Sequence, residues 1–353
     1  MSRLGVFVGE QGNWSFFRDI FEDLRAHHQV SVYTPKRYSL PLLQGRLNRW
    51  AHFHGIESLL RRSDLAFFEW ASELLEPASH MRKRCPIVTR LHSYELYAWG
   101  PRINWNNVDR VILVSEAMRR NFAVEFPEHA AKAVTVPNAV ALDVFTPPEA
   151  RDGSLNLGML CSFFPRKRIY EVILMFSKLA ARHPSARLHL GGGRVHAPDH
   201  DEYYLACRRL VTRLGLEHAV IFYDRVDQTA AWLRQIDVFI SNSYWEGQQV
   251  ALLEAMAAGC YCLSHRWDGA EEVLPEKALH AGDDELLQHI LEYAGLAAAG
   301  KRVLHEEMRR LACERFDGAR QRGRLRRIID SILTTKGDAP EPAAASSAAR
   351  LRG

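Results

Sequence analysis

The sequence has few of the features that mark secreted, disulfide-bonded or membrane-spanning proteins. Its six cysteines form no Cys-x-x-Cys pair, so we expect reduced thiols rather than a disulfide framework. No apolar run reaches the roughly 20 residues that a membrane-spanning helix needs, and residues 5–9 predict a buried strand rather than part of a signal peptide. A net charge of only +4 does not indicate a nucleic-acid-binding protein. These absences favour a cytoplasmic protein with no nucleic-acid partner.

The length and the strand pattern predict an α/β protein of two domains. A chain of 353 residues is too long for one ordinary hydrophobic core. Short β-branched strands alternate with helical patterns, and the clearest linker is the polar, turn-rich stretch 147–154. We expect one domain over residues 1–148 and a second over 149–316. A helix should follow at 317–335, and a disordered tail rich in Ala, Pro and Ser at 336–353.

Residues 246–259, which read EGQQVALLEAMAAG, combine two carboxylates with a strand, a turn and a helix. The apolar run 236–241 predicts a buried strand, and a turn at the carboxyl end of a parallel strand is where open α/β sheets bind ligands. The following helix start suits a phosphate, and Glu254 lies about 8 Å further along the helix axis than its start. Glu246 and Glu254 can therefore hold the two ends of an elongated polyhydroxylated ligand. The alternative is that Glu246 caps the helix and Glu254 is solvated.

This stretch resembles the signature of the retaining glycosyltransferases of family 4. The resemblance implies the GT-B architecture, in which two Rossmann-like doubly wound domains face each other across a cleft and the last helix crosses back to the first domain. It also implies that Glu246 contacts the donor sugar and Glu254 the nucleotide ribose. The remaining donor contacts implied here are Gly247, Gln248, Gln249 and Val250. The family often has Phe-Gly where this chain has Gln248 and Gln249.

A basic turn follows the predicted strand at 155–160. Residues 165–168 read PRKR, and cations at a strand-to-helix turn suit a diphosphate leaving group, whose negative charge grows as the glycosidic bond breaks. The turn resembles the family segment whose arginine and lysine grip the donor diphosphate. Lys167 matches the lysine, whereas Met159 stands in place of the arginine. Either Arg166 or Arg168 would have to replace that arginine.

Two features of the first domain also resemble parts of the family site. His92 follows the predicted strand at 86–89 and matches the cleft histidine, which lies near the donor sugar. Gly12 and Asn13 form a turn after the first strand, and the resemblance implies that this turn faces the donor across the cleft. A plain tight turn is the alternative. Residues 134–145 resemble a Pro-Asn-Gly-Val-Asp segment in which Ala139 and Ala141 replace the glycine and the aspartate.

The segment 36–62 is rich in basic and aromatic residues. Glu57 is its only acid, and Gly45 and Gly55 should interrupt any helix there. Basic residues interleaved with Trp50 and Phe53 can rest on an anionic membrane surface. The alternative is an ordinary solvated basic face. The cations in question are Lys36, Arg37, Arg46, Arg49, Arg61 and Arg62.

The resemblance implies a retaining hexosyltransferase that acts in polysaccharide or glycoconjugate biosynthesis. Its donor would be a UDP- or GDP-linked sugar, and its acceptor a glycan, a lipid-linked molecule or a small molecule. Glu246, His92 and Lys167 would be catalytic, and neither a metal ion nor another cofactor is expected. The protein would work in the cytoplasm or peripherally on the cytoplasmic face of a membrane. Two alternatives stay open: a nucleotide-sugar epimerase or glycogen-synthase-like enzyme of the same fold, and a degenerate subunit that binds nucleotide or a partner without turnover.

Overall fold

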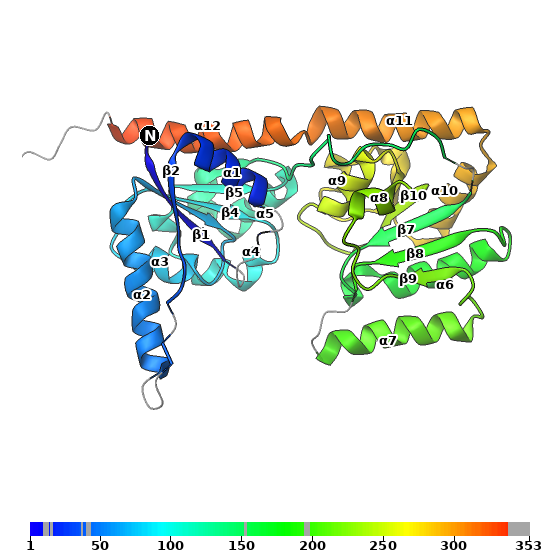
Figure 1. Ribbon diagram of the computed structural model, residues 1–353, viewed down its shortest axis with the longest axis horizontal. Helices are drawn as coiled ribbons and strands as arrows, with labels where there is room; N and C mark the ends of the chain where they lie inside the picture. The colour runs from blue at the N-terminus through cyan, green and yellow to red at the C-terminus, as the bar shows by residue number, and fades with distance from the viewer. Residues whose placement is uncertain are drawn as a thin grey trace, which may run out of the picture.

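The chain forms two α/β domains, each built on a parallel six-stranded sheet (Figure 1). The computed structural model describes residues 1–9, 14, 17–36, 38–39, 44–151, 154–193 and 198–337. Strand order is β2-β1-β3-β4-β5-β6 in the first sheet and β12-β11-β10-β7-β8-β9 in the second. The predicted α/β class with two Rossmann-like domains is therefore confirmed.

The first sheet is buried on both faces, as the apolar composition of its strands predicts. On β3, Phe68 stacks on Phe7 at a ring-centroid distance of 4.3 Å, and Phe67 stacks on Phe17 of the opposite face at 5.5 Å. Successive side chains of a strand point to opposite faces, so one strand supplies both cores. The elements are β1 Arg3–Val8, α1 Arg18–His27, β2 Gln29–Val32, α2 Gln44–Arg62, β3 Leu65–Glu69, α3 Leu75–His80, β4 Ile87–Leu91, α4 Glu95–Ala98, β5 Arg110–Leu113, α5 Glu116–Glu125 and β6 Ala133–Thr135.

The second sheet carries the strand, turn and helix that the sequence predicts around residue 246. β10 lies between β11 and β7 at the centre of the sheet, and its four residues are buried. Gly259 ends α9 with φ +70°, the left-handed conformation expected of a helix-terminating glycine. The elements are β7 Asn156–Leu160, α6 Ile169–Ala180, β8 Arg187–Gly191, α7 Pro198–Arg213, β9 Val220–Phe222, α8 Thr229–Leu233, β10 Val238–Ser241, α9 Val250–Ala257, β11 Tyr261–His265, β12 Leu279–His280, α10 Asp283–Gly295 and α11 Ala298–Arg315.

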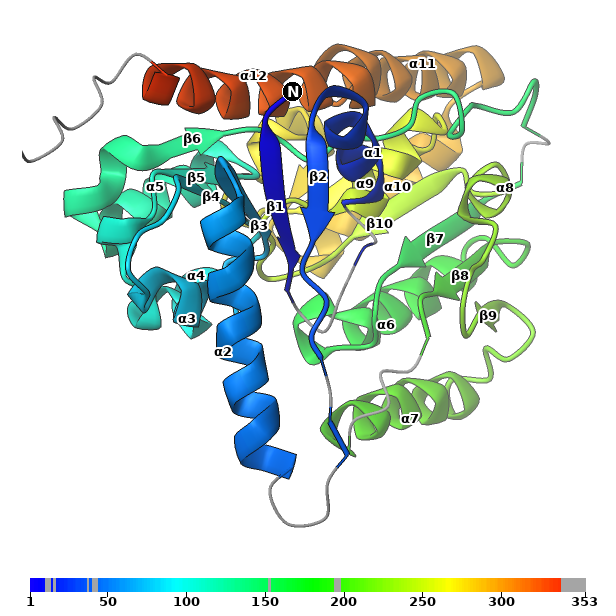
Figure 2. The ribbon, with the colours of Figure 1, turned by 60° about the vertical axis from the view of Figure 1, so that its left-hand side comes forward.

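The last helix, α12 Gly318–Gly337, lies on the first domain, whereas α11 covers the second (Figures 1 and 2). Leu325 and Ile329 of α12 are buried in the core that β1 and α1 share. Arg326 Nη1 donates to Asp23 Oδ1 of α1 at 2.7 Å. Residues 336 and 337, expected in a disordered tail, belong to this helix. The rest of the expected tail, 338–353, lies outside the described residues.

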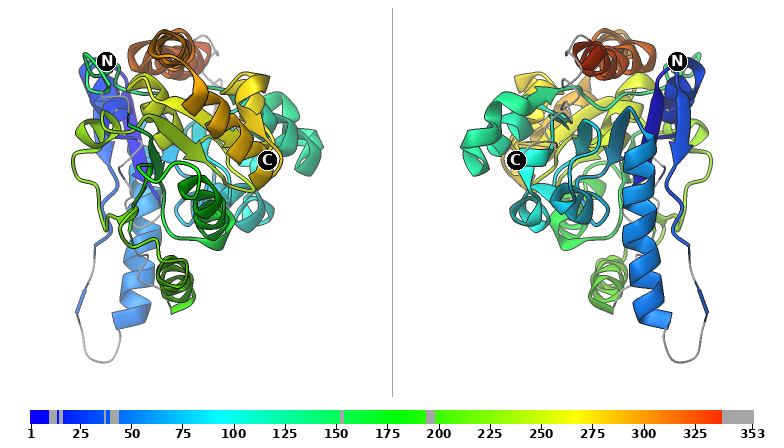
Figure 3. Two further views of the ribbon diagram at one scale, coloured as in Figure 1. Left: turned by 90° about the vertical axis from the view of Figure 1, so that its right-hand side faces the viewer. Right: turned by 90° about the vertical axis from the view of Figure 1, so that its left-hand side faces the viewer.

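Helix α2 differs from the sequence expectation, because it runs without a break through Gly45 and Gly55. Gly55 serves close packing instead of a helix end: a Cβ there would lie 3.0 Å from Cε2 of Tyr33. Figure 3 shows α2 projecting well beyond the first sheet. Trp50 and Phe53 are 55% and 42% exposed on it. Within the described chain, no helix combines the length and the apolar character that would let it cross a bilayer.

Candidate active site

Glu246 lies between β10 and α9 in a cluster with two cations of the basic turn. Its carboxylate forms an ion pair with the ammonium group of Lys167, and both side chains are buried. Ser243 Oγ donates to Glu246 Oε1 at 2.7 Å, and Arg166 Nη1 lies 3.7 Å from Glu246 Oε2. Helix α9 has Gln249 as its N-cap and no side-chain capping bond, so Glu246 does not cap it. The structure thus brings together Glu246, Lys167 and Arg166. This is expected, because these residues follow the carboxyl ends of the neighbouring strands β10 and β7.

The structure separates the two arginines that could replace the family arginine. Arg168 is buried, and its Nη2 lies 2.9 Å from Asp283 Oδ1 while its guanidinium stacks on Tyr244 at 4.8 Å. Arg168 is therefore held within the second domain. Arg166 keeps 42% of its side chain exposed and lies next to Glu246, so it is the arginine that faces the cluster. Met159 is buried in the core of the second domain.

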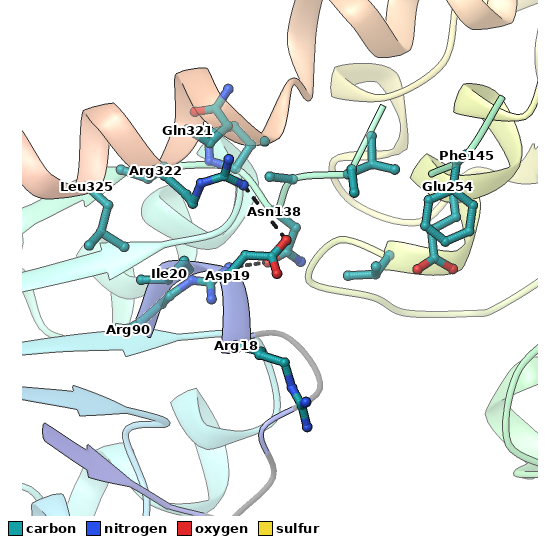
Figure 4. Close-up of a pocket in the computed structure, with 17 residues that line it drawn as sticks. Arg18, Asp19, Ile20, Arg90, Asn138, Phe145, Glu254, Gln321, Arg322 and Leu325 are labelled. Atoms are coloured by element: carbon teal, nitrogen blue, oxygen red, sulfur yellow. Dashed lines mark hydrogen bonds and ion pairs between the residues drawn. The ribbon is translucent and has the colours of Figure 1, made fainter. Parts of the chain in front are cut away.

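Glu254 faces a separate cavity between the two domains (Figure 4). The cavity measures about 150 Å³ and is lined on the first-domain side by Arg18 and Arg90. Among the described residues the Glu254 carboxylate has no hydrogen-bond or ion-pair partner, and burial raises its pKa to about 7. A partly buried carboxylate without a partner is suited to accept hydrogen bonds from a ligand's hydroxyl groups.

His92 lies at the carboxyl end of β4, on the first-domain side of the site. Its Nε2 is 2.8 Å from Oε1 of Glu69, and its ring stacks on Trp70 with a centroid distance of 4.2 Å. Trp70 has φ +77°, a backbone conformation that a non-glycine residue adopts only where the surrounding structure holds it there. Gly247 of the second domain touches this segment directly: a Cβ at Gly247 would lie 1.9 Å from the His92 carbonyl oxygen. Only glycine allows that approach.

Among the other expected donor contacts, the side chains of Gln248 and Gln249 are engaged with protein groups. Gln248 Oε1 accepts the Asn138 backbone N–H at 2.6 Å. Gln249 Oε1 accepts from Ser241 Oγ at 2.5 Å. Val250 opens α9 and lines the same cavity as Glu254. Gly12 and Asn13 lie outside the described residues, so their predicted place across the cleft stays a prediction.

Some residues of the site have no signal in the sequence. Arg18 of α1 and Gln321 and Arg322 of α12 line the Glu254 cavity. Motif spacing cannot reveal them, because helices far apart in the sequence bring them there. The partners of Glu272 also appear only in the structure: its carboxylate accepts the backbone N–H groups of Glu116 and Ala117 at 2.7 and 2.6 Å.

No group of three or more His, Cys, Asp or Glu side chains forms a metal-binding arrangement in the described part of the chain. The expectation that no metal ion is required stays a prediction.

Two family models match the chain, one on each domain. The model described as Glycosyltransferase Family 4 matches residues 16–144. The model described as Glycosyl transferases group 1 matches residues 154–306. Together they cover every strand of the two sheets except β1.

Among curated proteins, the N-acetyl-alpha-D-glucosaminyl L-malate synthase of Bacillus anthracis is 26% identical over 242 residues, which are 64% of this chain and 60% of that protein. The alpha-monoglucosyldiacylglycerol synthase of Streptococcus pneumoniae is 24% identical over 60% of this chain and 50% of its own length. The phosphatidylinositol N-acetylglucosaminyltransferase gpi3 subunit of Schizosaccharomyces pombe is 23% identical over 49% of this chain and 38% of its own length. The alignments thus span less than two thirds of these relatives.

Solved structures share the fold over nearly the whole chain. Anabaena HepE in complex with UDP and glucose superposes with a TM-score of 0.79 at 17% identity, covering 94% of this chain and 100% of that one. The sucrose-phosphate synthase of Thermosynechococcus elongatus has a TM-score of 0.75 at 15% identity, covering 95% and 100%. The matched models, the GT-B fold and the motif at 246–259 show that the chain belongs to glycosyltransferase family 4, the group 1 glycosyl transferases.

Proposed function

We propose that this protein is a retaining glycosyltransferase that moves a hexose from a nucleotide sugar to a glycan, lipid-linked or small-molecule acceptor. The observation that carries the proposal is the cluster of Lys167, Glu246 and Arg166 at the strand ends of the second sheet. Two cations suit a departing diphosphate, and the carboxylate beside them can bind sugar hydroxyls. HepE is similar in fold and binds UDP and UDP-glucose, which favours a UDP-sugar over a GDP-sugar as donor.

The cluster and its surroundings suit the departure of a nucleoside diphosphate. Lys167 and Arg166 would stabilise the negative charge that grows on the diphosphate as the bond to the sugar breaks. Glu246 and His92 would orient the sugar from the two domains. Following the family resemblance, the acceptor attacks from the face that the diphosphate leaves, and the departing phosphate takes the acceptor proton. No separate general base is then needed, and the anomeric configuration is retained.

Glu254 would hold the nucleotide at its ribose. Its carboxylate is partly buried and has no partner among the described residues, while Val250 beside it opens helix α9. Ribose hydroxyl groups can donate hydrogen bonds to such a carboxylate. Glu246 and Glu254 then bind the sugar and the nucleoside ends of one donor molecule.

The acceptor side of the protein suggests a lipid-linked acceptor on the cytoplasmic face of a membrane. Arg46, Arg49, Trp50 and Phe53 are exposed on the projecting half of α2. Arg61 lies at the other end of the helix and pairs with Glu57 at 2.6 Å, so its charge is already matched. The names of two relatives refer to diacylglycerol and phosphatidylinositol, which supports an acceptor at a membrane surface. Contact would be peripheral, through charge and interfacial aromatic rings.

A donor screen with radiolabelled nucleotide sugars, with and without acceptors, tests the proposal. We expect slow hydrolysis of one UDP-sugar alone and transfer when an acceptor is present. NMR of the product should show the anomeric configuration of the donor, and an inverted product would refute retention. Interconversion of the donor sugar without transfer would indicate an epimerase. Nucleotide binding without turnover for every donor and acceptor would indicate the degenerate subunit, in which Met159 stands where the family has an arginine.

A further inference from the structure

The loop that carries Glu246 is tied to the first domain through Gln248. The side-chain oxygen of Gln248 accepts the Asn138 backbone N–H at 2.6 Å, and the Gln248 carbonyl accepts from Asn138 Nδ2 at 3.0 Å. Both residues are buried. Asn138 lies in the loop that follows β6, so these two bonds cross from one domain to the other.

A chain of buried polar groups continues from Asn138 to His92. Arg90 Nη2 donates to Asn138 Oδ1 at 2.5 Å, and Arg90 Nη1 donates to Glu69 Oε1 at 2.9 Å. The same Glu69 oxygen lies 2.8 Å from His92 Nε2. All five side chains are buried, and a buried polar network of this kind holds its members in one arrangement.

We propose that Gln248 is a positioning residue, which couples the docking of the second domain to the placement of the His92 ring. The inference rests on the proposed function, in which Glu246 and His92 act on one sugar from opposite domains. Gln248 is two residues from Glu246 in the sequence, and four successive polar contacts connect its side chain to His92. Its hydrogen bond to Asn138 therefore fixes the position of Glu246 relative to His92. The direct contact of Gly247 with the His92 carbonyl group requires the same docked geometry.

This role differs from the donor contact that the family resemblance implies for Gln248. Its side-chain oxygen is already used by the Asn138 N–H. No partner is found for its amide nitrogen among the described residues, so the interdomain contact needs only an acceptor at this position. Where the family often has an apolar phenylalanine, this chain has a residue that can bridge the domains.

Glu272 provides a matched control, because it joins the domains without touching this network. Its carboxylate accepts the N–H groups of Glu116 and Ala117 at the start of α5. Asn121 Nδ2 donates to Asp268 Oδ2 at 3.0 Å at the same contact. Loss of Glu272 therefore weakens domain docking but removes no bond from the path between Gln248 and His92.

Kinetics and UDP binding of Gln248→Leu and Gln248→Glu test the assignment. We expect Gln248→Leu to lower kcat roughly tenfold or more while UDP affinity, measured by calorimetry, changes less than about twofold, because the bond lost is interdomain. Gln248→Glu should restore most of the turnover, since a carboxylate oxygen accepts the same N–H. A large loss of UDP affinity in Gln248→Leu, or a Gln248→Glu enzyme no better than Gln248→Leu, would overturn the proposal.

The His92 ring signal in a ¹H–¹³C NMR spectrum gives a test that needs no turnover. The signal is assigned by its disappearance in His92→Asn. Gln248→Leu should shift it, whereas Gln248→Glu and Glu272→Ala should leave it nearly in place. An unmoved signal in Gln248→Leu, or an equal shift in Glu272→Ala, would refute the coupling. If no donor is turned over, the proposed transferase function fails, while this measurement still decides on Gln248.

Discussion

The ammonium group of Lys167 and the carboxylate of Glu246 form a buried ion pair between residues 79 positions apart in the sequence. A diphosphate that binds Lys167 must compete with this carboxylate. The pair therefore couples two proposed roles. Lys167, which we expect to bind the diphosphate leaving group, is paired with Glu246, which we expect to bind the sugar.

Replacing Glu246 should separate catalysis from nucleotide binding. In Glu246→Ala the sugar loses its carboxylate, so we expect turnover to fall by about ten- to a hundredfold, since a charge-assisted hydrogen bond contributes about 1.5–3 kcal/mol. UDP affinity should stay the same or increase, because Lys167 no longer has a competing anion. Steady-state kinetics and calorimetry measure the two effects. A marked loss of UDP affinity would mean that Glu246 binds the nucleotide.

Replacing Lys167 should affect the second phosphate group most. Lys167→Ala should lower turnover and weaken UDP by about 1.5–3 kcal/mol, the range for a hydrogen bond to a charged group. The binding of UMP, which lacks the distal phosphate, should weaken much less. Calorimetric titration of both nucleotides makes the comparison, and equal losses would show that the lysine does not reach the distal phosphate.

The two arginines that flank Lys167 should give opposite phenotypes. Arg168→Ala removes the partner of Asp283 and the cation stacked on Tyr244, so the free energy of unfolding should drop by about 1–3 kcal/mol. Arg166→Ala changes a partly exposed side chain, so its stability should stay within about 0.5 kcal/mol of the wild type while turnover falls. Denaturant unfolding and kinetics distinguish them. An Arg166 variant with normal turnover would exclude that arginine from the site.

Glu254 should make both stability and nucleotide binding depend on pH. Burial raises its pKa from 4.5 to about 7, so the folded chain holds more protons than the unfolded chain between these values. Its contribution to stability therefore declines as pH rises through that window, and Glu254→Gln should be more stable than wild type at pH 8 by about 1–3 kcal/mol. Near pH 4.5 the two should be equally stable. Thermal unfolding across pH measures the difference.

The same variant should bind nucleotide more weakly. Ribose hydroxyls lose a charged acceptor in Glu254→Gln, so UDP binding at pH 8 should weaken by about 1.5–3 kcal/mol. Wild-type affinity relative to the variant should rise from pH 6 to pH 8 as the carboxyl group ionises, and the comparison cancels the titration of UDP itself. Unchanged UDP affinity at pH 8 would contradict the ribose assignment.

Membrane binding should depend on the projecting end of α2. Arg46→Gln with Arg49→Gln should weaken binding to anionic vesicles by about 2 kcal/mol, at about 1 kcal/mol for each arginine near the surface. Arg61→Gln with Arg62→Gln, at the opposite end of the helix, is the matched control and should have a smaller effect. Salt should weaken the attraction between the arginines and the anionic lipids, because the Debye length is only about 10 Å at 0.1 M salt. It should not weaken the apolar insertion of Trp50 and Phe53. Wild-type protein that never sediments with anionic vesicles at low salt would refute the membrane contact.

The sequence by itself determined the α/β class and the strand, turn and helix around Glu246. These follow from local properties: β-branched runs predict buried strands, and glycine at 259 ends a helix in the left-handed conformation. The placement of Lys167 after β7 and of His92 after β4 also followed, because each residue comes soon after a predicted strand of its own sheet, where open α/β sheets bind ligands. The same local reasoning was wrong about α2, where Gly55 packs against Tyr33 instead of breaking the helix.

Only the tertiary structure decided which side chains meet. Arg166 and Arg168 are equivalent in the sequence, and packing against Asp283 assigns one of them to the interior of the second domain. Gln248 accepts a hydrogen bond from Asn138, which lies 110 positions away in the sequence. Helix α12 brings Gln321 and Arg322 to the cavity of Glu254. The last two contacts depend on how the two domains pack together, and periodicity along the chain carries no information on that arrangement.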